Sequence, residues 1–403
     1  NGLSRGELCT SLSLCVCVSF CVCVFLCAFV CAMADSSSGR GRSMLRKEDI
    51  PPQMIEHIHK SLTWTVFDVL WVPRSVRFVG LGLFARNTGS MQVLELEKGK
   101  AVVREEHEKR HGFKCGTFAH ASVEERTLAT GDFSGRMSIW DLEDASIPVY
   151  TVQAHEGIVN AIDGCGGGTS VDKGPPEIAT AGKDGCVHVW DPRQKGEAVA
   201  SLRPEEGSTP ADCWTVAFGN SFDNEERCVA AGYDNGDIKL FDLRTNTLRW
   251  ETNVGNGVCG LQFDRKIIEM NKLAATCLER SFHLFDMRTF HPTEGYASLQ
   301  QSAHNSTVWC AKHLPSNRDV FMTAGGNGNL NLWRYHTPEQ RRVQDANGKY
   351  RGVMGSVEEL ASHNFSTQPI TSFDWSPDRA GLCVFGALDQ CIRVGLVTKL
   401  NTL

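Results

Sequence analysis

Three polar residues near the middle of the chain have the types that a hydrolase uses. His155, Thr180 and Asp184 could supply a general base, a hydroxyl nucleophile and an orienting carboxylate. No Gly-x-Ser-x-Gly nucleophile elbow accompanies them, and the aspartate falls in a predicted hairpin turn. We therefore interpret these residues as a structural hydrogen-bond network that ties a loop, a strand and a turn together.

Other arrangements that could bind a metal or a cofactor are equally incomplete. Cys310 and His313 are close in sequence, but no second pair stands at a spacing that would complete a metal site. The Gly-rich stretch 164–176 resembles a phosphate loop only superficially, because no Lys-Ser/Thr ends it and no helix is predicted after it. The sequence has no Walker loop, dinucleotide fingerprint or paired acids. We predict a protein that is not an enzyme and that uses no metal or cofactor.

The elements that position these residues repeat along the chain. Seven times a polar turn residue is followed, six residues later, by the residue that closes a strand. The pairs are Thr88–Leu94, Ser134–Trp140, Asp184–Trp190, Asn235–Phe241, Glu279–Phe285, Asn327–Trp333 and Asp389–Gly395. In five pairs Gly follows the turn residue and supplies the positive φ of a tight hairpin. A period of 44 to 62 residues with Trp-Asp endings is typical of WD40 repeats.

Each repeat predicts four short strands, which is the composition of a propeller blade. The predicted fold is therefore all-β, a seven-bladed WD40 β-propeller over residues 53–403. Too few residues follow Gly395 to form the outer strand of the last blade. We expect residues 53–59 to supply that strand and to join both ends of the chain in one sheet. The long last interval predicts an exposed polar loop at about residues 334–367.

In WD40 proteins a His before the first strand and a Trp at the end of the third belong to a buried polar network. Two repeats of this chain carry such a set. The predicted network residues are His155, Thr180, Asp184 and Trp190 in one repeat, and His304, Thr323 and Trp333 in another.

The first 52 residues do not follow the repeat. Residues 8–32 carry no charge and could form a signal anchor that crosses a bilayer. The alternative is that residues 1–32 are a translated upstream leader, because the first Met is Met33 and the preceding letters alternate as SLSL and CVCV. Residues 33–52, rich in Ser, Gly, Arg and Pro, are predicted to form a flexible linker.

The net charge and the cysteine distribution indicate which partners and which compartment to expect. The net charge of −6 argues against a nucleic-acid-binding surface, which usually needs a basic stripe. Beyond residue 32 the cysteines are scattered singly, as in a reduced intracellular protein. We expect a cytoplasmic protein without a nucleic-acid partner, and without a membrane partner if the leader is not translated.

Candidate binding residues come from aligning the first strands of the repeats on their closing residues. One column then falls near the mouth of the central channel. It contains Phe67, Lys114, Asn160, Trp214, Cys259, Trp309 and Thr371. Phe67, Trp214 and Trp309 could together anchor a partner segment, because binding energy concentrates in aromatic side chains. The alternative is that these rings only fill the space between blades.

A second candidate surface comes from a repeated strand ending. Three successive blades end in aromatic-Asp-x-Arg, which places Arg193, Arg244 and Arg288 at strand exits. This resembles the box by which some WD40 proteins dock on the cullin-4 ligase adaptor. An alternative function is therefore a substrate receptor of a cullin-4-type ubiquitin ligase, acting through Arg193 and Arg244. The structural alternative is that each Arg pairs with a nearby carboxylate in solvent.

Longer stretches resemble one family within the WD40 proteins. CWTVAFGNSFDNEERCVAAGYDNGDIKLFDLR, LRWETNVGNGVCGLQFDRK, VWDPRQK and STQPITSFDWSPD are similar to the Monad family, and the similarity covers about residues 53–403. The resemblance implies a cytoplasmic axonemal-dynein assembly factor that works alongside the RuvB-like and prefoldin-like co-chaperone assembly. It also implies a non-enzymatic scaffold with co-chaperone subunits as partners and dynein heavy chains as clients.

Overall fold

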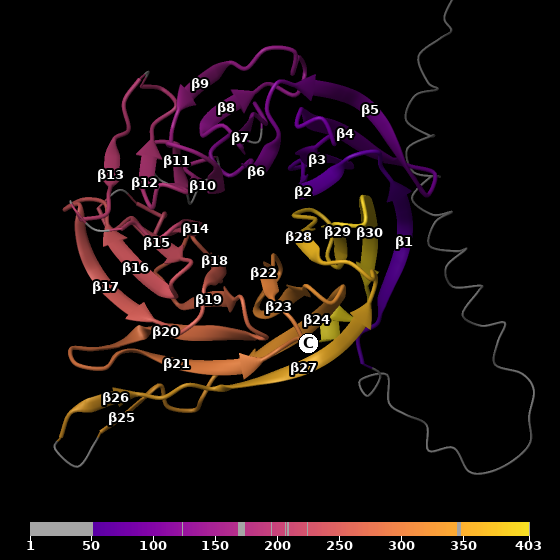
Figure 1. Cartoon of the computed structure of the whole chain (residues 1–403). Coiled ribbons are helices and arrows are strands. Elements are labelled where there is room, and N and C mark those ends of the chain that lie inside the picture. Colours follow the sequence, from indigo (N-terminus) through magenta and orange to yellow (C-terminus); the bar gives the residue numbers. More distant parts are fainter. Residues whose placement is uncertain are drawn as a thin grey trace, which may run out of the picture. The chain divides into compact units, whose positions relative to one another are not determined.

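A computed structural model describes residues 51–402, apart from residues 123, 168–173, 195, 206, 208, 224 and 345–347. Seven antiparallel four-stranded sheets stand in a ring around a central channel (Figure 1). The predicted seven-bladed propeller is therefore confirmed. The predicted leader over 1–32 and nearly all of the linker over 33–52 lie outside the described residues and stay predictions. Across the described ranges, no helix combines the length and the apolar composition that a bilayer crossing requires.

The blades are numbered here in chain order. Blade 1 contains β2 (Thr65–Trp71), β3 (Arg77–Leu83), β4 (Gly89–Glu97) and β5 (Lys100–Lys109); blade 2 contains β6 (Phe113–Thr117), β7 (Leu128–Asp132), β8 (Arg136–Trp140) and β9 (Tyr150–Gln153). Blade 3 contains β10 (Val159–Cys165), β11 (Glu177–Gly182), β12 (Val187–Trp190) and β13 (Ala200–Leu202); blade 4 contains β14 (Cys213–Gly219), β15 (Cys228–Tyr233), β16 (Asp237–Asp242) and β17 (Thr247–Asn253).

Blade 5 contains β18 (Val258–Phe263), β19 (Lys272–Cys277), β20 (Ser281–His291) and β21 (Gly295–Ser302); blade 6 contains β22 (Val308–Leu314), β23 (Asn317–Gly325), β24 (Asn329–His336) and β27 (Ser356–Asn364). Blade 7 contains β28 (Ile370–Trp375), β29 (Leu382–Ala387), β30 (Cys391–Val397) and β1 (Met54–Ser61), and a short 3-10 turn, η2 (Leu400–Thr402), follows β30. The strands β25 (Arg342–Gln344) and β26 (Tyr350–Gly352) form a separate two-stranded ribbon.

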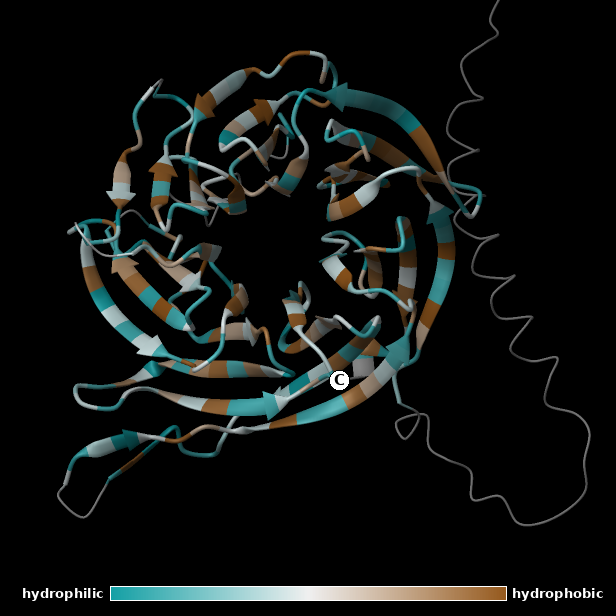
Figure 2. Cartoon of the chain, in the orientation of Figure 1, coloured by the Kyte–Doolittle hydropathy of each residue, from teal (hydrophilic) through white to brown (hydrophobic). Residues whose placement is uncertain are grey.

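The burial of each strand follows its place in the blade. Every residue of β15, a second strand, is buried, because the neighbouring blades cover both faces of the sheet there. The outer strand β17 buries only Trp250 fully, and Figure 2 shows the outer strands banded teal and brown. Apolar side chains from adjacent blades form the core, as where Leu240, Phe263 and Phe285 lie in one cluster. The core is therefore a ring of inter-blade layers.

Strand β1 closes the ring. It pairs antiparallel with β30, so that Met54 lies opposite Val397 and Ile58 lies opposite Val394. The predicted outer strand over 53–59 is thus confirmed, and it continues to Ser61. Ile58 is the one fully buried residue of β1 and packs in the cluster that contains Val394. The two ends of the propeller are consequently held in one hydrogen-bonded sheet.

Each inner strand contains a β-bulge near its beginning. In every blade the register between the first and second strands skips one residue, after the second pair in blade 1 and after the first pair in blades 2 to 7. The skipped residues are Phe67, Lys114, Asn160, Trp214, Cys259, Trp309 and Thr371. A bulge re-aims the side chain of its extra residue, so the fold sets these seven positions apart from the rest of the ladder.

The prediction of a loop over about 334–367 is wrong for most of its length. Strand β24 extends to His336, and β27 pairs with it as the outer strand of blade 6. The segment SVEELASHN alternates half-buried and exposed residues over part of its length, which suits an outer strand that has one face against the blades. The insertion proper lies between these two strands and contains the ribbon of β25 and β26.

Candidate functional site at the channel mouth

The seven bulge residues line one cavity on the axis of the ring, with a volume of about 860 Å³. All seven are half-buried. The structure therefore brings Phe67, Lys114, Trp214 and Trp309 together at the inner strands, as the strand alignment predicted. Because the bulges and not flexible loops carry them, their backbone positions are fixed by the sheets.

The aromatic side chains of the column are supported from the side. Phe67 makes an edge-to-face contact with Phe133, with ring centroids 5.1 Å apart, and the Lys114 ammonium lies 5.1 Å from the centre of the Phe67 ring. The ring of Trp214 lies so close to Gly257 that a Cβ there would come within 2.9 Å of it. The rings thus fill part of the space between blades and still present part of their surface to the cavity.

Three carboxylates in the cavity wall were not singled out from the sequence. Asp68, Asp163 and Asp374 each accept a hydrogen bond of 2.9 Å from a backbone N–H of the next blade, at Gly116, Phe218 and Trp71. Inner strands are sheet edges, and their channel-facing N–H groups would otherwise lack partners. The signal in the sequence is an acidic residue inside an apolar strand, as in TVFDVLW and ITSFDW.

Burial controls the charges in this wall. Burial raises the pKa of Asp374 to about 6, although Lys312 and the Trp71 N–H oppose the shift. Burial acts to lower the pKa of Lys312, but the carboxylates of Asp374, Asp68 and Asp163 outweigh it, so that the Lys312 pKa is raised. The cavity therefore carries an ammonium among carboxylates under an aromatic rim.

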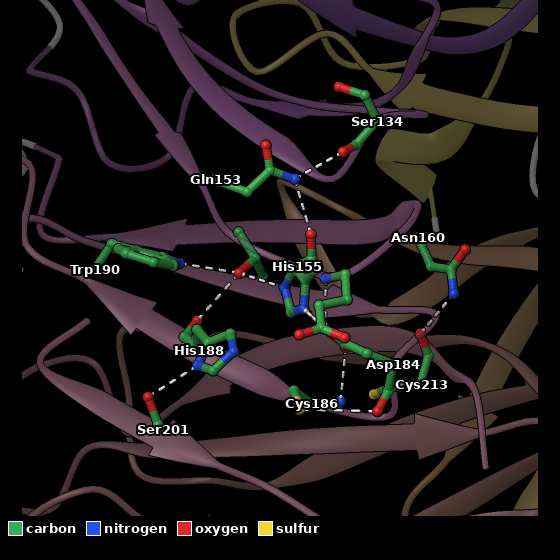
Figure 3. A network of polar contacts seen from close by, with 12 residues as sticks. Ser134, Gln153, His155, Asn160, Asp184, Cys186, His188, Trp190, Ser201 and Cys213 are labelled. Atoms are coloured by element: carbon green, nitrogen blue, oxygen red, sulfur yellow. Dashed lines mark hydrogen bonds and ion pairs between the residues drawn. The ribbon is translucent and has the colours of Figure 1, made fainter. Parts of the chain in front are cut away.

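The polar network of blade 3 lies outside the cavity (Figure 3). His155 Nε2 is 2.8 Å from Thr180 Oγ1, and Trp190 Nε1 donates to the same hydroxyl at 3.0 Å. His155 Nδ1 is 3.0 Å from Asp184 Oδ1. If His155 donates to the carboxylate, the Thr hydroxyl donates to Nε2 and accepts from the indole, so every group is satisfied.

The burial of this network suits a structural role. The side chains of His155 and Thr180 are fully buried, so no substrate reaches them. Burial acts to raise the pKa of Asp184, but hydrogen bonds from His155 and the Glu156 N–H lower it to about 2. The arrangement therefore contains an ionised acid locked to a turn and no accessible nucleophile.

The same geometry recurs in blade 6 and partly in blade 2. His304 Nε2 lies 2.8 Å from Thr323 Oγ1, and Trp333 Nε1 donates to that hydroxyl at 2.9 Å. Burial lowers the pKa of His304 to about 4. In blade 2 Trp140 donates to Thr130 at 2.8 Å without a His, a bond that the sequence reasoning missed. The ten-residue spacing shared by all three Thr–Trp pairs would have found it.

Within the part of the chain that the structure describes, no three His, Cys, Asp or Glu side chains gather in a way that could hold a metal ion. Cys310 and His313, the pair considered from the sequence, lie in strand β22 and contribute to the cavity wall. The His313 imidazole Nδ1 is 2.9 Å from Gln262 Oε1, and burial lowers its pKa to about 3. His313 is therefore part of the wall between blades 5 and 6, whereas Cys310 packs against the apolar cluster between blades 6 and 7.

Comparison with known proteins assigns the family. Residues 146–191 and 297–334 match the family "WD domain, G-beta repeat". "Dynein axonemal assembly factor 10" of Chlamydomonas reinhardtii is 58% identical over 351 residues, which are 87% of this chain and 98% of that protein. The chain belongs to the dynein axonemal assembly factor 10 family. The Homo sapiens protein of the same name is 57% identical over 350 residues, with the same shares covered. The resemblance to the Monad family is thus confirmed.

A solved structure shares the fold of this dynein axonemal assembly factor 10 family member. The WD40 β-propeller domain of Doa1 superposes with a TM-score of 0.62 at 15% sequence identity, covering 87% of this chain and 98% of that one. At this identity the likeness concerns the architecture alone.

The arginines of the aromatic-Asp-x-Arg endings lie at strand exits and not at the channel mouth. Arg193 is 61% exposed and already pairs with Asp191, through Nε to Oδ1 at 3.0 Å and Nη2 to Oδ2 at 2.7 Å. The side chain of Arg244 is exposed, and its backbone N–H donates to Asp242 at 2.9 Å. For Arg193 this geometry favours the structural alternative, in which the guanidinium pairs with a nearby carboxylate.

Proposed function

We propose that this chain is a non-enzymatic scaffold in the cytoplasmic preassembly of axonemal dynein arms. It acts with the RuvB-like and prefoldin-like co-chaperone assembly and holds dynein heavy chains as clients. The observation that carries the proposal is the similarity to proteins named dynein axonemal assembly factor 10 over almost their entire length. A propeller suits such work, because its sheets stay rigid while its loops and rims offer separate binding surfaces.

We assign one contact site to the channel mouth, formed by Phe67, Lys114, Trp214 and Trp309. Three half-buried aromatic rings surround a cavity of about 860 Å³, and each ring gains burial when a partner segment covers the mouth. Aromatic residues in such settings contribute a large share of binding energy. Lys114 adds a cation next to Phe67, which favours a partner with a carboxylate or a carbonyl at this point.

The double variant Trp214→Ala/Trp309→Ala tests the site. We expect any partner that contacts the channel mouth, whether a co-chaperone subunit or the heavy-chain client, to bind the double variant at least about tenfold more weakly than the native chain. The reason is that a hot-spot aromatic residue contributes roughly 2 kcal/mol or more to the binding free energy. The measurement is co-purification from ciliating cells in which the variant replaces the native chain. Leu248→Ala is the matched control, because Leu248 is exposed on the outer strand β17.

Two outcomes would overturn separate parts of the proposal. If the double variant retains every partner at native levels, the channel mouth is not the contact site. If cells that lack the chain assemble normal dynein arms, as seen by electron microscopy of axonemes, the function itself is wrong.

A further inference from the structure

The ribbon of β25 and β26 is fixed to blade 5 at its base. The Arg341 guanidinium donates to Asn271 Oδ1 at 2.9 Å, and it lies 3.4 Å from Asp286 Oδ1. Gly352 packs so closely that a Cβ there would lie 2.7 Å from the side chains of Thr289 and Ala297. Figure 1 shows the ribbon projecting beyond the ring from this base. The insertion therefore extends from blade 6 across the outside of blade 5.

Beyond this base the ribbon exposes apolar surface. Val343 is 48% exposed and Tyr350 is 62% exposed. All three residues of β25 are exposed. An isolated two-stranded ribbon is marginal in water, because it buries little on either face. A further strand would cover part of this surface.

The outer edge of β25 is suited to pair with a further strand. Val353 donates its N–H to the carbonyl of Arg341, and this register makes Val343 and Arg351 the next hydrogen-bonded pair. By the antiparallel alternation, the backbone N–H and C=O groups of Arg342 and Gln344 then point away from β26. Strand β26 lies against β20 and β21, so β25 is the outer strand of the ribbon. Among the residues that the structure describes, β25 pairs with β26 alone, and a strand edge without a partner is a template for strand addition.

The charge of the insertion indicates which strand would fit. Residues 337–355, between β24 and β27, contain four Lys or Arg and two Asp or Glu, a net charge of +2 in a chain whose net charge is −6. Arg351 already holds the Glu294 carboxylate at 2.9 Å on this exposed surface. A second copy of the chain would bring another basic ribbon against the first, and like charges would oppose it. An acidic partner is favoured.

We propose that β25 is a docking edge that pairs with an extended acidic segment of a partner protein. Val343 lies on one face of the ribbon, and Arg342 and Gln344 lie on the other, since side chains alternate along a strand. The partner segment therefore alternates apolar residues, which pack beside Val343, with carboxylates, which face Arg342. This surface is separate from the channel mouth and does not depend on the proposed function.

The test uses a fluorescein-labelled peptide of three Val-Glu repeats, titrated into the full chain by fluorescence anisotropy. We expect it to bind about tenfold more tightly than a peptide of three Val-Lys repeats, and to weaken with salt. A peptide with the same composition in two blocks, three Val then three Glu, should bind as weakly as the Lys peptide. Hydrogen exchange should show protection of the Arg342 and Gln344 amides on binding.

Two variants separate the charge from the edge. Arg342→Glu reverses the charge and also removes the hydrogen bond from the Arg342 guanidinium to the Arg288 carbonyl. Gln344→Pro removes an N–H that points outward and leaves the bonds between β25 and β26 in place. Each should lower the affinity for the Val-Glu peptide about tenfold, because each removes one of the two features that the peptide uses. Arg318→Glu changes an exposed arginine near the start of β23; it is the matched control and should bind normally.

Three results would overturn the proposal. They are equal binding of the Glu and Lys peptides, unchanged affinity in both ribbon variants, and a sedimentation experiment in which the chain alone dimerises through the ribbon. Thermal unfolding of each variant, which should match the native chain, shows that a lost affinity is not a lost fold.

Discussion

Thr180 and Thr323 are each the meeting point of a Trp indole and a His imidazole, whereas Thr130 meets only an indole. Removing the hydroxyl leaves these ring nitrogens buried without partners. Each orphaned group costs about 1–3 kcal/mol. The loss of stability when the Thr is replaced should therefore depend on how many ring nitrogens are left without a hydrogen-bond partner.

We predict that Thr180→Val lowers the free energy of unfolding by about 3 kcal/mol and Thr130→Val by about half as much, because the second change strands one donor only. Urea midpoints of the two variants and the native chain provide the measurement. Equal shifts for the two variants would show that the His bond contributes nothing.

A second residue-scale prediction concerns Asp374. Its pKa is about 6 in the folded chain, against an ordinary value of 3.8, so the folded state retains a proton that the unfolded state loses. Between about pH 4 and pH 6 stability therefore falls as pH rises, and the contribution is constant above that window. Asp374→Asn keeps an oxygen for the Trp71 N–H and should remove this slope. The check is the difference between melting temperatures of native and variant chains across this range; a constant difference would contradict it.

At the residue scale, the sequence predicts a residue's place correctly where that place is set by contacts within its own repeat. The column of Phe67, Trp214 and Trp309 followed from aligning strands, since the bulge occupies the same place in each blade. The roles of Asp68 and Asp374 could not be read in this way, because their hydrogen-bond donors belong to another blade. Gly395 stands where the other six repeats have an apolar side chain, and space explains the difference, because a Cβ there would lie 3.0 Å from Cys383 Sγ.

At the scale of elements, β1 is held by one buried side chain. Ile58 is 8% exposed, whereas Ile55 on the same strand is 45% exposed. The two residues are three positions apart and both pair with β30. The strand therefore offers a matched pair of positions that differ chiefly in burial.

We predict that Ile58→Asp destabilises the closing sheet by about 3 kcal/mol, because it places a carboxylate in an apolar cluster, while Ile55→Asp has a small effect. Hydrogen exchange of the β30 amides should accelerate in the first variant only. Unchanged exchange in Ile58→Asp would mean that β1 does not hold β30.

The strands of blade 6 show where element prediction stopped. The outer strand β27 does not stand out in the sequence, because its segment SVEELASHN lies at the end of a long polar interval whose composition predicts a loop. Strand pairing across such an interval is decided by which edge is open, in this case that of β24, and not by local composition. The separate ribbon of β25 and β26 was missed for the same reason.

At the scale of the whole molecule, the seam between β1 and β30 is one of seven blade positions at which the ring could be closed. Its two sides adjoin, since the Thr398 N–H donates to the Gln53 carbonyl at 2.9 Å. A short Gly-Ser linker can therefore join Lys399 to Gln53, and the chain can be opened elsewhere. The position of the new chain ends decides whether those ends lie in one blade and are held together by strand pairing.

We predict that a permuted chain opened between Thr245 and Asn246 melts close to the native temperature, because β17 then closes blade 4 as β1 closes blade 7. A chain opened between Gly255 and Asn256 separates blades 4 and 5 without a shared sheet and should melt several degrees lower. Differential scanning calorimetry compares the two. If the chain opened between Gly255 and Asn256 melts at the higher temperature, strand pairing between the chain ends is not what keeps the ring closed.

The recurring extra residue in every inner strand has a consequence for how new specificities could arise. The seven side chains lie outside the register of the ladders that carry them, so their exchange leaves the pairing between first and second strands in place. We therefore expect substitutions at these seven positions to change which partner segment the proposed contact site prefers, while the strand pairing of the blades stays the same.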